Sequence, residues 1–272
     1  MRLLLAILVF GSAGLSAFAQ TPVVVAGGVL NAASSDKTGL PLAPGSLVSI
    51  YGTNLVSASA SAGSIPLPYN LSDASVTFNG VNAPMLGTAH GPSYDQLNVQ
   101  IPWEAVAFTP PATNGTVRMV VTRNGAQSDP FTIAVTTASP GIFTTGSGPG
   151  QAIAYGNSDG IISGPVSAVS HPIKIGDALV ILATGLGPVD QTVASGNVPA
   201  SGVLARTLTT PIVLVGNVPG LVVFSGLSPQ FVGVYQINIV IAAGTPTGNT
   251  VPLQILMNGI TTRNDATIAV SQ

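Results

Sequence analysis

The sequence predicts an all-β protein with two tandem antiparallel β-sandwich domains, and two observations lead to this fold class. One is an internal duplication, and the other is a hydrophobic period of two residues along short segments. Two copies are too few for a solenoid, so we expect two domains of one fold. Segments 45–55, 94–99, 123–125 and 132–135 return in the same order as 176–186, 234–239, 257–259 and 267–270.

Residues 1–19 have the pattern of a secretory signal peptide. Arg2 gives a positive start, residues 3–10 form an apolar run, and residues 17–19 (Ala-Phe-Ala) form a small-x-small cleavage site. The apolar run is too short to span a membrane, and no later stretch approaches about 18 consecutive apolar residues. We therefore expect cleavage after Ala19 and a secreted, extracellular or periplasmic protein that does not span the membrane.

The first copy, residues 20–137, contains short runs rich in β-branched residues and bounded by Gly, Pro or Asn. Asn79-Gly80 and Asn124-Gly125 lie between such runs. Both pairs predict type I′ hairpins, because Asn and Gly tolerate the positive φ that both central residues of this turn need. The strands expected in this copy are 47–51, 76–78, 97–101 and 117–122.

The second copy, residues 138–272, repeats this organisation, with Asn258-Gly259 in the place of the second hairpin turn. The 32 glycines and 22 prolines interrupt the chain too often for long helices. About seven short strands per copy, separated by turns, are typical of an antiparallel sandwich. The strands expected here are 178–182, 212–215, 235–241 and 253–257.

The composition limits the classes of function. Hydrophobic residues make up 46% of the chain, but charged residues only 6%, against about 25% in an average soluble protein. The Lys and Arg residues are scattered singly, so we expect no nucleic-acid binding. The chain has no cysteine, which excludes disulfides and a thiol nucleophile.

Several ordered motifs resemble known families. Residues 43–55 are similar to the opening of the IPT/TIG family of immunoglobulin-like domains, where a Pro-Gly turn leads into a strand that ends in Gly-Thr-Asn-Leu. The mature chain as a whole resembles an uncharacterised C-terminal domain family of secreted acidobacterial proteins. The resemblance implies an immunoglobulin-like fold for both copies and transfers no catalytic residue, because that family has no established activity. The matching blocks are 31–34, 43–45, 96–103, 139–143, 183–188, 224–229 and 235–238.

Candidates for catalysis are few. His90 and His171 are the only histidines, and neither lies in a Gly-x-Ser-x-Gly elbow, so we interpret both as exposed loop residues. Glu104 is the only glutamate, and the aspartates stand singly in turn-like contexts, so nothing local forms a glycosidase carboxylate pair. We therefore expect no enzyme activity and no cofactor.

Metal binding has one weak candidate. Two distant histidines without cysteine do not form an ordinary zinc site. Residues 157–160 (Asn-Ser-Asp-Gly) match part of a calcium loop, but the carboxylate that would end the loop is missing. A plain β-turn is the favoured interpretation, and calcium is the alternative.

The most unusual polar feature is a Gln-x-Asn pair inside a strand of each copy, Gln96 with Asn98 and Gln236 with Asn238. A spacing of two places both amides of a pair on one face of the sheet. Amides are poor strand formers, so an interaction should compensate for them. The favoured explanation is hydrogen bonding to loop backbone that closes the sandwich, and the alternative is recognition of sugar hydroxyls.

Aromatic residues beside these amides complete the candidate ligand-binding set. Tyr94, Trp103 and Tyr235 are candidates for stacking on a ligand. Trp103, the only tryptophan, is more simply explained by packing in a core or a domain interface. The candidate ligand-binding residues are Tyr94, Gln96, Asn98, Trp103, Tyr235, Gln236 and Asn238.

These patterns favour an exported, non-catalytic binding or adhesion protein of the cell surface or extracellular space. Its expected partner is a polysaccharide or a cell-surface protein. The alternative is a structural or assembly component of the envelope that acts through protein–protein contacts and exposed strand edges.

Overall fold

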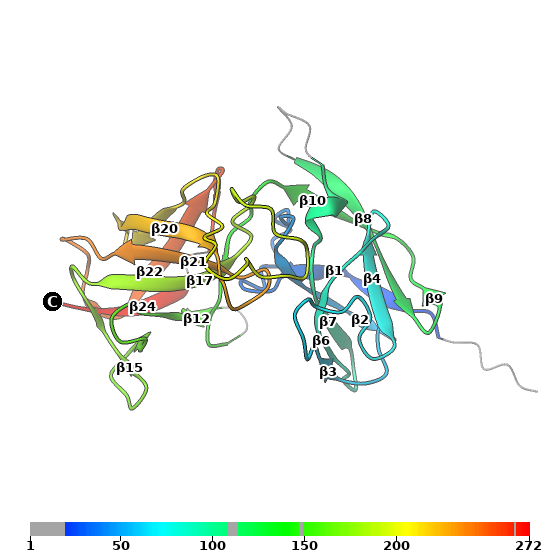
Figure 1. Cartoon of the computed structure of the whole chain (residues 1–272). Helices are drawn as coiled ribbons and strands as arrows, with labels where there is room; N and C mark the ends of the chain where they lie inside the picture. Colours follow the sequence, from blue (N-terminus) through cyan, green and yellow to red (C-terminus); the bar gives the residue numbers. More distant parts are fainter. Residues whose placement is uncertain (1–19, 108–113, 147–148, 264) are drawn as a thin grey trace, which may run out of the picture.

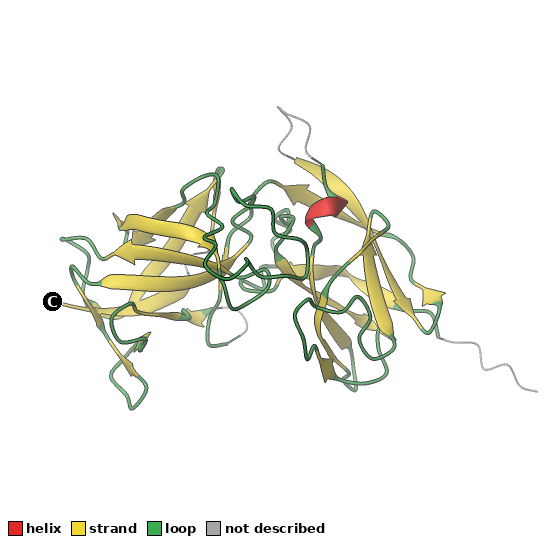
Figure 2. Cartoon of the chain, in the orientation of Figure 1, coloured by secondary structure: helices red, strands yellow, loops and turns green. Residues whose placement is uncertain are grey.

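The computed structural model describes residues 20–107, 114–146, 149–263 and 265–272. The expected signal peptide, residues 1–19, lies outside the described residues. In the described part, the secondary structure consists of strands β1–β24 and one 3-10 helix, η1 (Trp103–Ala105) (Figure 2). No helix in these ranges is long and apolar enough to cross a membrane.

The first sandwich is built from β1 to β10, which form two sheets. Fully buried side chains from both sheets, such as Ile50 and Phe78, fill the space between them. One sheet has the order β1 (Val23–Asn31), β2 (Leu47–Thr53), β7 (Asp95–Gln100), β6 (Met85–Ala89) and β3 (Ala60–Ser61). The other has the order β10 (Phe131–Thr136), β8 (Asn114–Arg123), β4 (Ala74–Phe78) and β5 (Val81–Asn82), with β9 (Ala126–Gln127) beside β8.

The second sandwich has its own hydrophobic core and is built from β11 to β24. One sheet has the order β15 (Ser170–His171), β14 (Ile162–Ser163), β13 (Ala154–Gly156), β17 (Ala178–Thr184), β21 (Tyr235–Val240) and β20 (Leu221–Leu227), with β11 (Gly141–Ile142) beside β17. The other has the order β12 (Gly150–Gln151), β24 (Ala266–Ser271), β22 (Gly248–Met257), β18 (Ile212–Val215) and β19 (Val218–Pro219), with β16 (Ile173–Lys174) beside β24 and β23 (Ile260–Thr261) beside β22.

The strand order of the two sandwiches confirms the duplication. The order β2-β7-β6 returns as β17-β21-β20, and β10-β8-β4-β5 returns as β24-β22-β18-β19. Figure 1 shows the two sandwiches as neighbouring lobes. The chain is therefore an all-β tandem of two immunoglobulin-like sandwiches.

The three expected hairpin turns have the backbone conformation of type I′. Both central residues have positive φ, for example 49° at Asn79 and 81° at Gly80. The turn between β18 and β19 is equivalent to the one between β4 and β5, but it uses Gly216-Asn217, with φ of 57° and 68°. The sequence pattern missed this turn because the two residues occur in reversed order.

A few parallel contacts depart from the purely antiparallel expectation. Leu42 forms a parallel bridge with Val135, and Ile173 pairs in parallel with Val270 at the equivalent place. In each copy the chain starts in the sheet of β2 or β17 and then passes to the edge of the opposite sheet. The crossing segment meets the last strand of its copy, β10 or β24, in the parallel direction.

The two lobes are joined by buried hydrogen bonds. Thr184 Oγ1 accepts a hydrogen bond from Leu47 N (3.0 Å) and donates one to Gly233 O (2.7 Å). Gln100 Nε2 donates to Gly45 O (3.1 Å), and Gln100 Oε1 accepts from the amide N of residue 196 (2.7 Å). Two of these bonds cross between the copies, from Leu47 N to Thr184 Oγ1 and from the amide N of residue 196 to Gln100 Oε1. The other two hold the neighbouring backbone of each copy in place at the junction.

Trp103 lies at this junction. Its ring packs against the core of the second sandwich, and its backbone N donates to Ser195 Oγ (2.9 Å). A Cβ added at Gly45, where φ is +77°, would meet the Trp103 ring at 2.0 Å, so glycine is required there. This position agrees with the interface interpretation of Trp103.

Candidate functional site

The amides of the first copy lie on the outer face of the sheet that contains β2 and β7. Residues alternate along both strands, so Ile50 and Leu97 point into the core while Ser49, Gln96 and Asn98 point away from it. Ser49 is directly opposite Asn98 in the register of the two strands. Opposed side chains on one face are close enough to interact, and these two do.

The amides bond one another rather than loop backbone. Ser49 Oγ and Gln96 Nε2 each donate to Asn98 Oδ1 at 2.8 Å, and Gln96 Nε2 lies 3.3 Å from Ser49 Oγ. The explanation that we favoured from sequence, in which these amides close the sandwich by bonding loop backbone, is therefore wrong for the first copy. Ser49 lies beside these amides because of the register between β2 and β7, and this register cannot be read from the local sequence.

This arrangement leaves hydrogen-bonding capacity on the surface. Among the described residues, no partner is present for Gln96 Oε1 or Asn98 Nδ2. One acceptor and one donor from neighbouring planar amides therefore face outward. They are held in place by the bonds within the trio Ser49, Gln96 and Asn98, which we call the amide trio.

Two tyrosines border the amide trio. Tyr51 is directly opposite Gln96, and Tyr94, two residues before Gln96, falls on the same face. The two rings make an edge-to-face contact with centroids 6.0 Å apart and planes at 69°. Tyr94 is 59% exposed, so one ring face is available to a ligand. Sequence reasoning missed Tyr51, although it alternates with Ser49 along β2.

The face is hollowed on both sides of Tyr51. The amide hollow, of about 380 Å³, is lined by the amide trio, Tyr51 and Phe143 of the second copy, among others. The tyrosine hollow, of about 500 Å³, is lined by Tyr51, Tyr94, Lys37 and residues 25–28, among others. The register of β1 against β2 shifts between Val24 and Val29, so the pairing of the two strands is irregular beside this hollow.

The second copy keeps the amides but not their surroundings. Gln236 Nε2 donates to Asn238 Oδ1 at 2.8 Å, as in the first copy. Leu182 and Val180 stand opposite these amides in place of Tyr51 and Ser49. The neighbouring aromatic ring, Phe224, lies under the guanidinium of Arg206, with 5.0 Å between the guanidinium carbon and the ring centroid. The two equivalent faces therefore have different chemistry.

Two candidate stacking residues lie away from the amides. Tyr235 directly precedes Gln236, so alternation turns its side chain into the core, where it is fully buried and donates a hydrogen bond to Gly187 O. Burial raises the pKa of Tyr235. Its prediction as a ligand contact is wrong, because no part of the ring is accessible. Trp103 packs at the lobe junction and not beside the amide trio.

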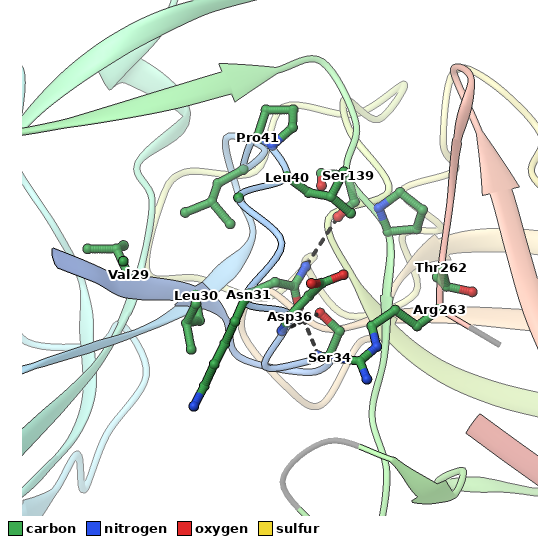
Figure 3. A pocket seen from close by; sticks show the side chains of 15 residues that line it. Val29, Leu30, Asn31, Ser34, Asp36, Leu40, Pro41, Ser139, Thr262 and Arg263 are labelled. Carbon is green, nitrogen blue, oxygen red and sulfur yellow. Dashed lines mark hydrogen bonds between the residues drawn. The ribbon is translucent and has the colours of Figure 1, made fainter. Parts of the chain in front are cut away.

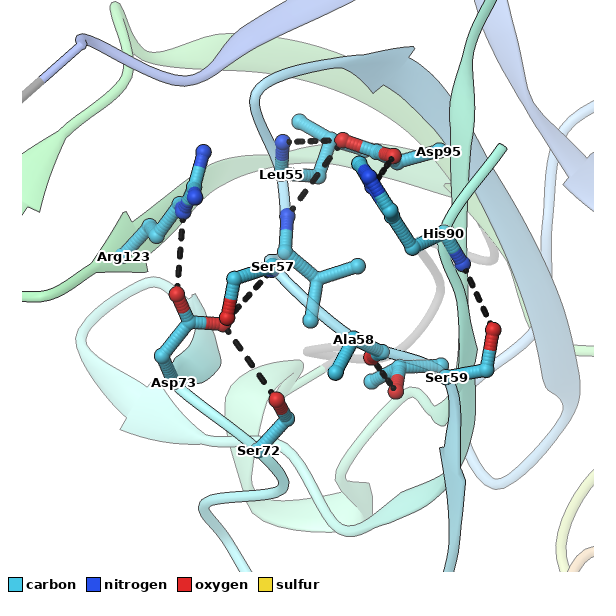
Figure 4. A network of polar contacts seen from close by, with 11 residues as sticks. Leu55, Ser57, Ala58, Ser59, Ser72, Asp73, His90, Asp95 and Arg123 are labelled. Carbon is cyan, nitrogen blue, oxygen red and sulfur yellow. Dashed lines mark hydrogen bonds and ion pairs between the residues drawn. The ribbon is translucent and has the colours of Figure 1, made fainter. Parts of the chain in front are cut away.

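Ionisable side chains next to this face fix the loop that follows β2 (Figure 4). Asp95 Oδ2 accepts hydrogen bonds from Leu55 N (2.8 Å) and Val56 N (3.4 Å), and Asp95 Oδ1 lies 2.7 Å from His90 Nδ1. Burial raises the pKa of Asp95, but hydrogen bonds from His90 and from backbone N–H groups outweigh it and lower the pKa overall. Asp73 Oδ1 accepts from Ser57 N at 2.9 Å.

The His90–Asp95 pair has the geometry of two members of a catalytic triad. The third member would be a hydroxyl bonded to His90 Nε2, and the described residues place none there. The hydroxyl of Ser59 instead accepts a hydrogen bond from His90 N (2.9 Å). The pair therefore holds the loop after β2 in place. Sequence reasoning did not detect it, because the two residues meet only through the turn between β6 and β7.

The calcium candidate is a turn stabilised by a carboxylate–histidine pair. Asp159 Oδ1 accepts from Ile161 N (2.9 Å), and Asp159 Oδ2 lies 2.9 Å from His171 Nε2. The hydrogen bond with Pro172 O and the contact with Asp159 raise the pKa of His171. Within the described ranges, no group of three or more His, Cys, Asp or Glu side chains could hold a metal ion.

A small cavity at the lobe junction is a less suitable ligand site (Figure 3). Its volume is about 70 Å³, whereas ligand pockets have volumes of roughly 300–1,000 Å³. Asn31 at its edge donates through Nδ2 to Ser139 O (3.2 Å) and accepts from Ala33 N (2.9 Å) through Oδ1. Its polar groups thus join the lobes, and the outer face with the amide trio is the candidate site.

Comparisons with known proteins add little to this geometry. No protein-family model matches the chain, so none supports the resemblance to the acidobacterial family, and no curated protein matches it. Solved structures similar to the chain include SGBP-B from a complex xyloglucan utilization locus in Bacteroides uniformis (14% identity, 92% of this chain and 50% of that chain, TM-score 0.26). Others are the Yersinia pseudotuberculosis adhesin InvE (14%, 91% and 58%, TM-score 0.23) and domains 5–6 of the S-layer protein SbsC (12%, 92% and 98%, TM-score 0.20).

The chain thus spans about half the length of the first two structures. At such low identities and TM-scores, these similarities carry no argument about function.

Proposed function

We propose that this chain is an exported, non-catalytic binding protein of the cell surface or extracellular space that recognises a neutral carbohydrate. The signal-like segment before Gln20 supports export. The single observation that carries the proposal is the outer face of β2 and β7. There Tyr94 and Tyr51 border the outward-facing donor and acceptor of the amide trio.

The chemistry of this face suits a sugar. A sugar ring offers hydroxyls that both donate and accept hydrogen bonds, and planar amides complement them. The apolar face of a sugar packs on an aromatic ring, and Tyr94 presents such a ring. The residues that line the amide hollow include no Asp, Glu, Lys or Arg, which favours a neutral ligand over a charged one.

The test is binding of the purified protein to soluble glycans and insoluble polysaccharides, with Tyr94→Ala and the double variant Gln96→Ala/Asn98→Ala in parallel. Both variants should lose saturable binding while melting like the parent. The matched control is Gln236→Ala/Asn238→Ala, which removes the same amides where Leu182 and Val180 replace Tyr51 and Ser49. Equal loss in the control, or no binding by the parent, would contradict the proposal.

A second candidate function is assembly through protein contacts, and one strand favours it. Strand β20 is a sheet edge, and its residues Leu221 and Val223 are 66% and 53% exposed. Residues 205–207 bond the second half of β20, with Leu227 N donating to Ala205 O and Thr207 N donating to Ser225 O (both 2.9 Å), much as β3 covers β6 in the first copy. Among the described residues, only the first half of β20, around Leu221 and Val223, has no strand beside its outer edge. An exposed apolar edge can pair with another chain. Sedimentation at rising concentration should then show association that Val223→Lys abolishes, and a monomer at all concentrations would contradict it.

A further inference from the structure

A third hollow lies where the two lobes meet, and both copies line it. This junction hollow, of about 440 Å³, is lined by Ile65, Leu67 and Leu86 of the first copy and by Phe231 and Val234 of the second, among others. Phe231 is 53% exposed although it is large and apolar. Such a side chain in a concave junction is a candidate ligand contact.

The junction hollow continues from the amide hollow. Leu86 lies at the irregularity of β6, between Met85 and Gly87, and it lines both hollows. A path along the surface therefore runs from the tyrosines over the amide trio and Leu86 to Phe231. Aromatic rings stand at both ends of this path, and Phe143 lines its middle.

The second-copy wall of the path is fixed in position. Thr184 bonds both Leu47 N and Gly233 O, which ties the loop that carries Phe231 to β2. A Cβ on Gly233, where φ is +70°, would lie 2.7 Å from a Leu47 methyl group, so the loop backbone packs directly on this leucine. The two lobes thus present one preformed surface, which reduces the entropy lost on binding.

The chemistry of the path favours a glycan chain over a peptide. The residues that line the amide and junction hollows include no Asp, Glu, Lys or Arg. The amide trio lies on the face of the sheet, where a peptide cannot add as a further strand, because strand addition needs a free edge. Outward amides and spaced rings instead match alternating hydroxyls and apolar faces.

We infer that the amide and junction hollows, with Tyr94 of the adjoining tyrosine hollow at one end, form one trough that binds a neutral polysaccharide chain across both lobes, with Phe231 as the distal contact. This inference rests on the proposed function and adds the size of the ligand. The trough should select extended chains over single sugars, because a short ligand reaches either the tyrosines or Phe231 but not both.

The test uses size-fractionated oligosaccharides from dextran, cellulose and mannan, with affinity measured by calorimetry against chain length. The parent should bind longer chains more tightly until the trough is filled. Phe231→Ala should weaken binding of the longest chains by roughly tenfold and leave the shortest unchanged. Tyr94→Ala should weaken binding at every length. The control is Tyr69→Ala, since Tyr69 is 50% exposed and lines none of the tyrosine, amide and junction hollows.

The outcomes separate the two proposals. If Tyr94→Ala weakens binding but Phe231→Ala behaves like the parent at all lengths, the trough is wrong and the carbohydrate site stands. If affinity does not depend on length, the trough is wrong as well. If apolar peptides bind and Phe231→Ala abolishes that binding, the junction is a protein-binding groove. If no oligosaccharide binds, both proposals are wrong. Equal melting of all variants excludes misfolding as the cause.

Discussion

Replacing Thr184 with valine tests whether the two sandwiches unfold as one unit. Valine has nearly the shape of threonine, so packing is kept while both hydrogen bonds of the hydroxyl are lost. The side chain is fully buried, and Leu47 N–H and Gly233 C=O would lose their partner. A buried backbone group without a partner costs about 1–3 kcal/mol. We therefore expect the free energy of unfolding to fall by about 2–6 kcal/mol for the two groups.

The assay is calorimetric and urea-induced unfolding of the full chain. Because the bond from Leu47 N joins the lobes and the bond to Gly233 O holds the second-copy loop that packs on Leu47, one cooperative transition should separate into two. The matched control is Thr262→Val, which removes one buried bond, from Ile255 N (2.9 Å), inside the second sandwich alone. It should lower one transition without separating the lobes. A Thr184→Val protein that unfolds like the parent, or like the control, would refute this reasoning.

Three further predictions concern single turns and loops. Gly125→Val should destabilise the protein by about 1 kcal/mol or more, because φ there is +82°, and unchanged melting would contradict the turn assignment. His171 should titrate above its ordinary pKa in a proton NMR experiment, because Pro172 O and Asp159 favour the charged ring. Asp159→Asn should lower that pKa, and any stabilisation from the pair should be lost as pH rises through it. Asp95 has a lowered pKa, so its stabilisation should be present near neutral pH and be lost as pH falls through the folded value, whereas Asp95→Asn should remove this acid dependence.

Local patterns predicted the fold class and the central strands because these strands, and three of the hairpin turns, have their own signals. The two-residue period located β2 and β7, and Asn-Gly pairs located three hairpins. The candidate site could be predicted only in part. Tyr94, Gln96 and Asn98 share a face because they are spaced by two, which the chain itself dictates.

The remaining site residues depend on contacts that no local pattern contains. Ser49 and Tyr51 reach the amides only through the register between β2 and β7, which is set by packing of the whole sheet. Phe231 approaches them only through the packing of the two lobes. The error at Tyr235 came from treating it like Tyr94, although it stands one residue nearer to its amide and so faces the core.

The residue before the glutamine of the amide pair is a hydrogen-bond acceptor in the first copy and a donor in the second. In the first copy Asp95 accepts from the backbone N of Leu55, and in the second copy Tyr235 donates to the backbone O of Gly187. Both bonds tie the start of a central strand to the turn after its neighbour. Acid weakens the acceptor and only strong alkali ionises the donor, whose pKa burial raises. Duplication has thus given one chain two versions of the same bond with opposite pH limits, so no single pH breaks both of these bonds.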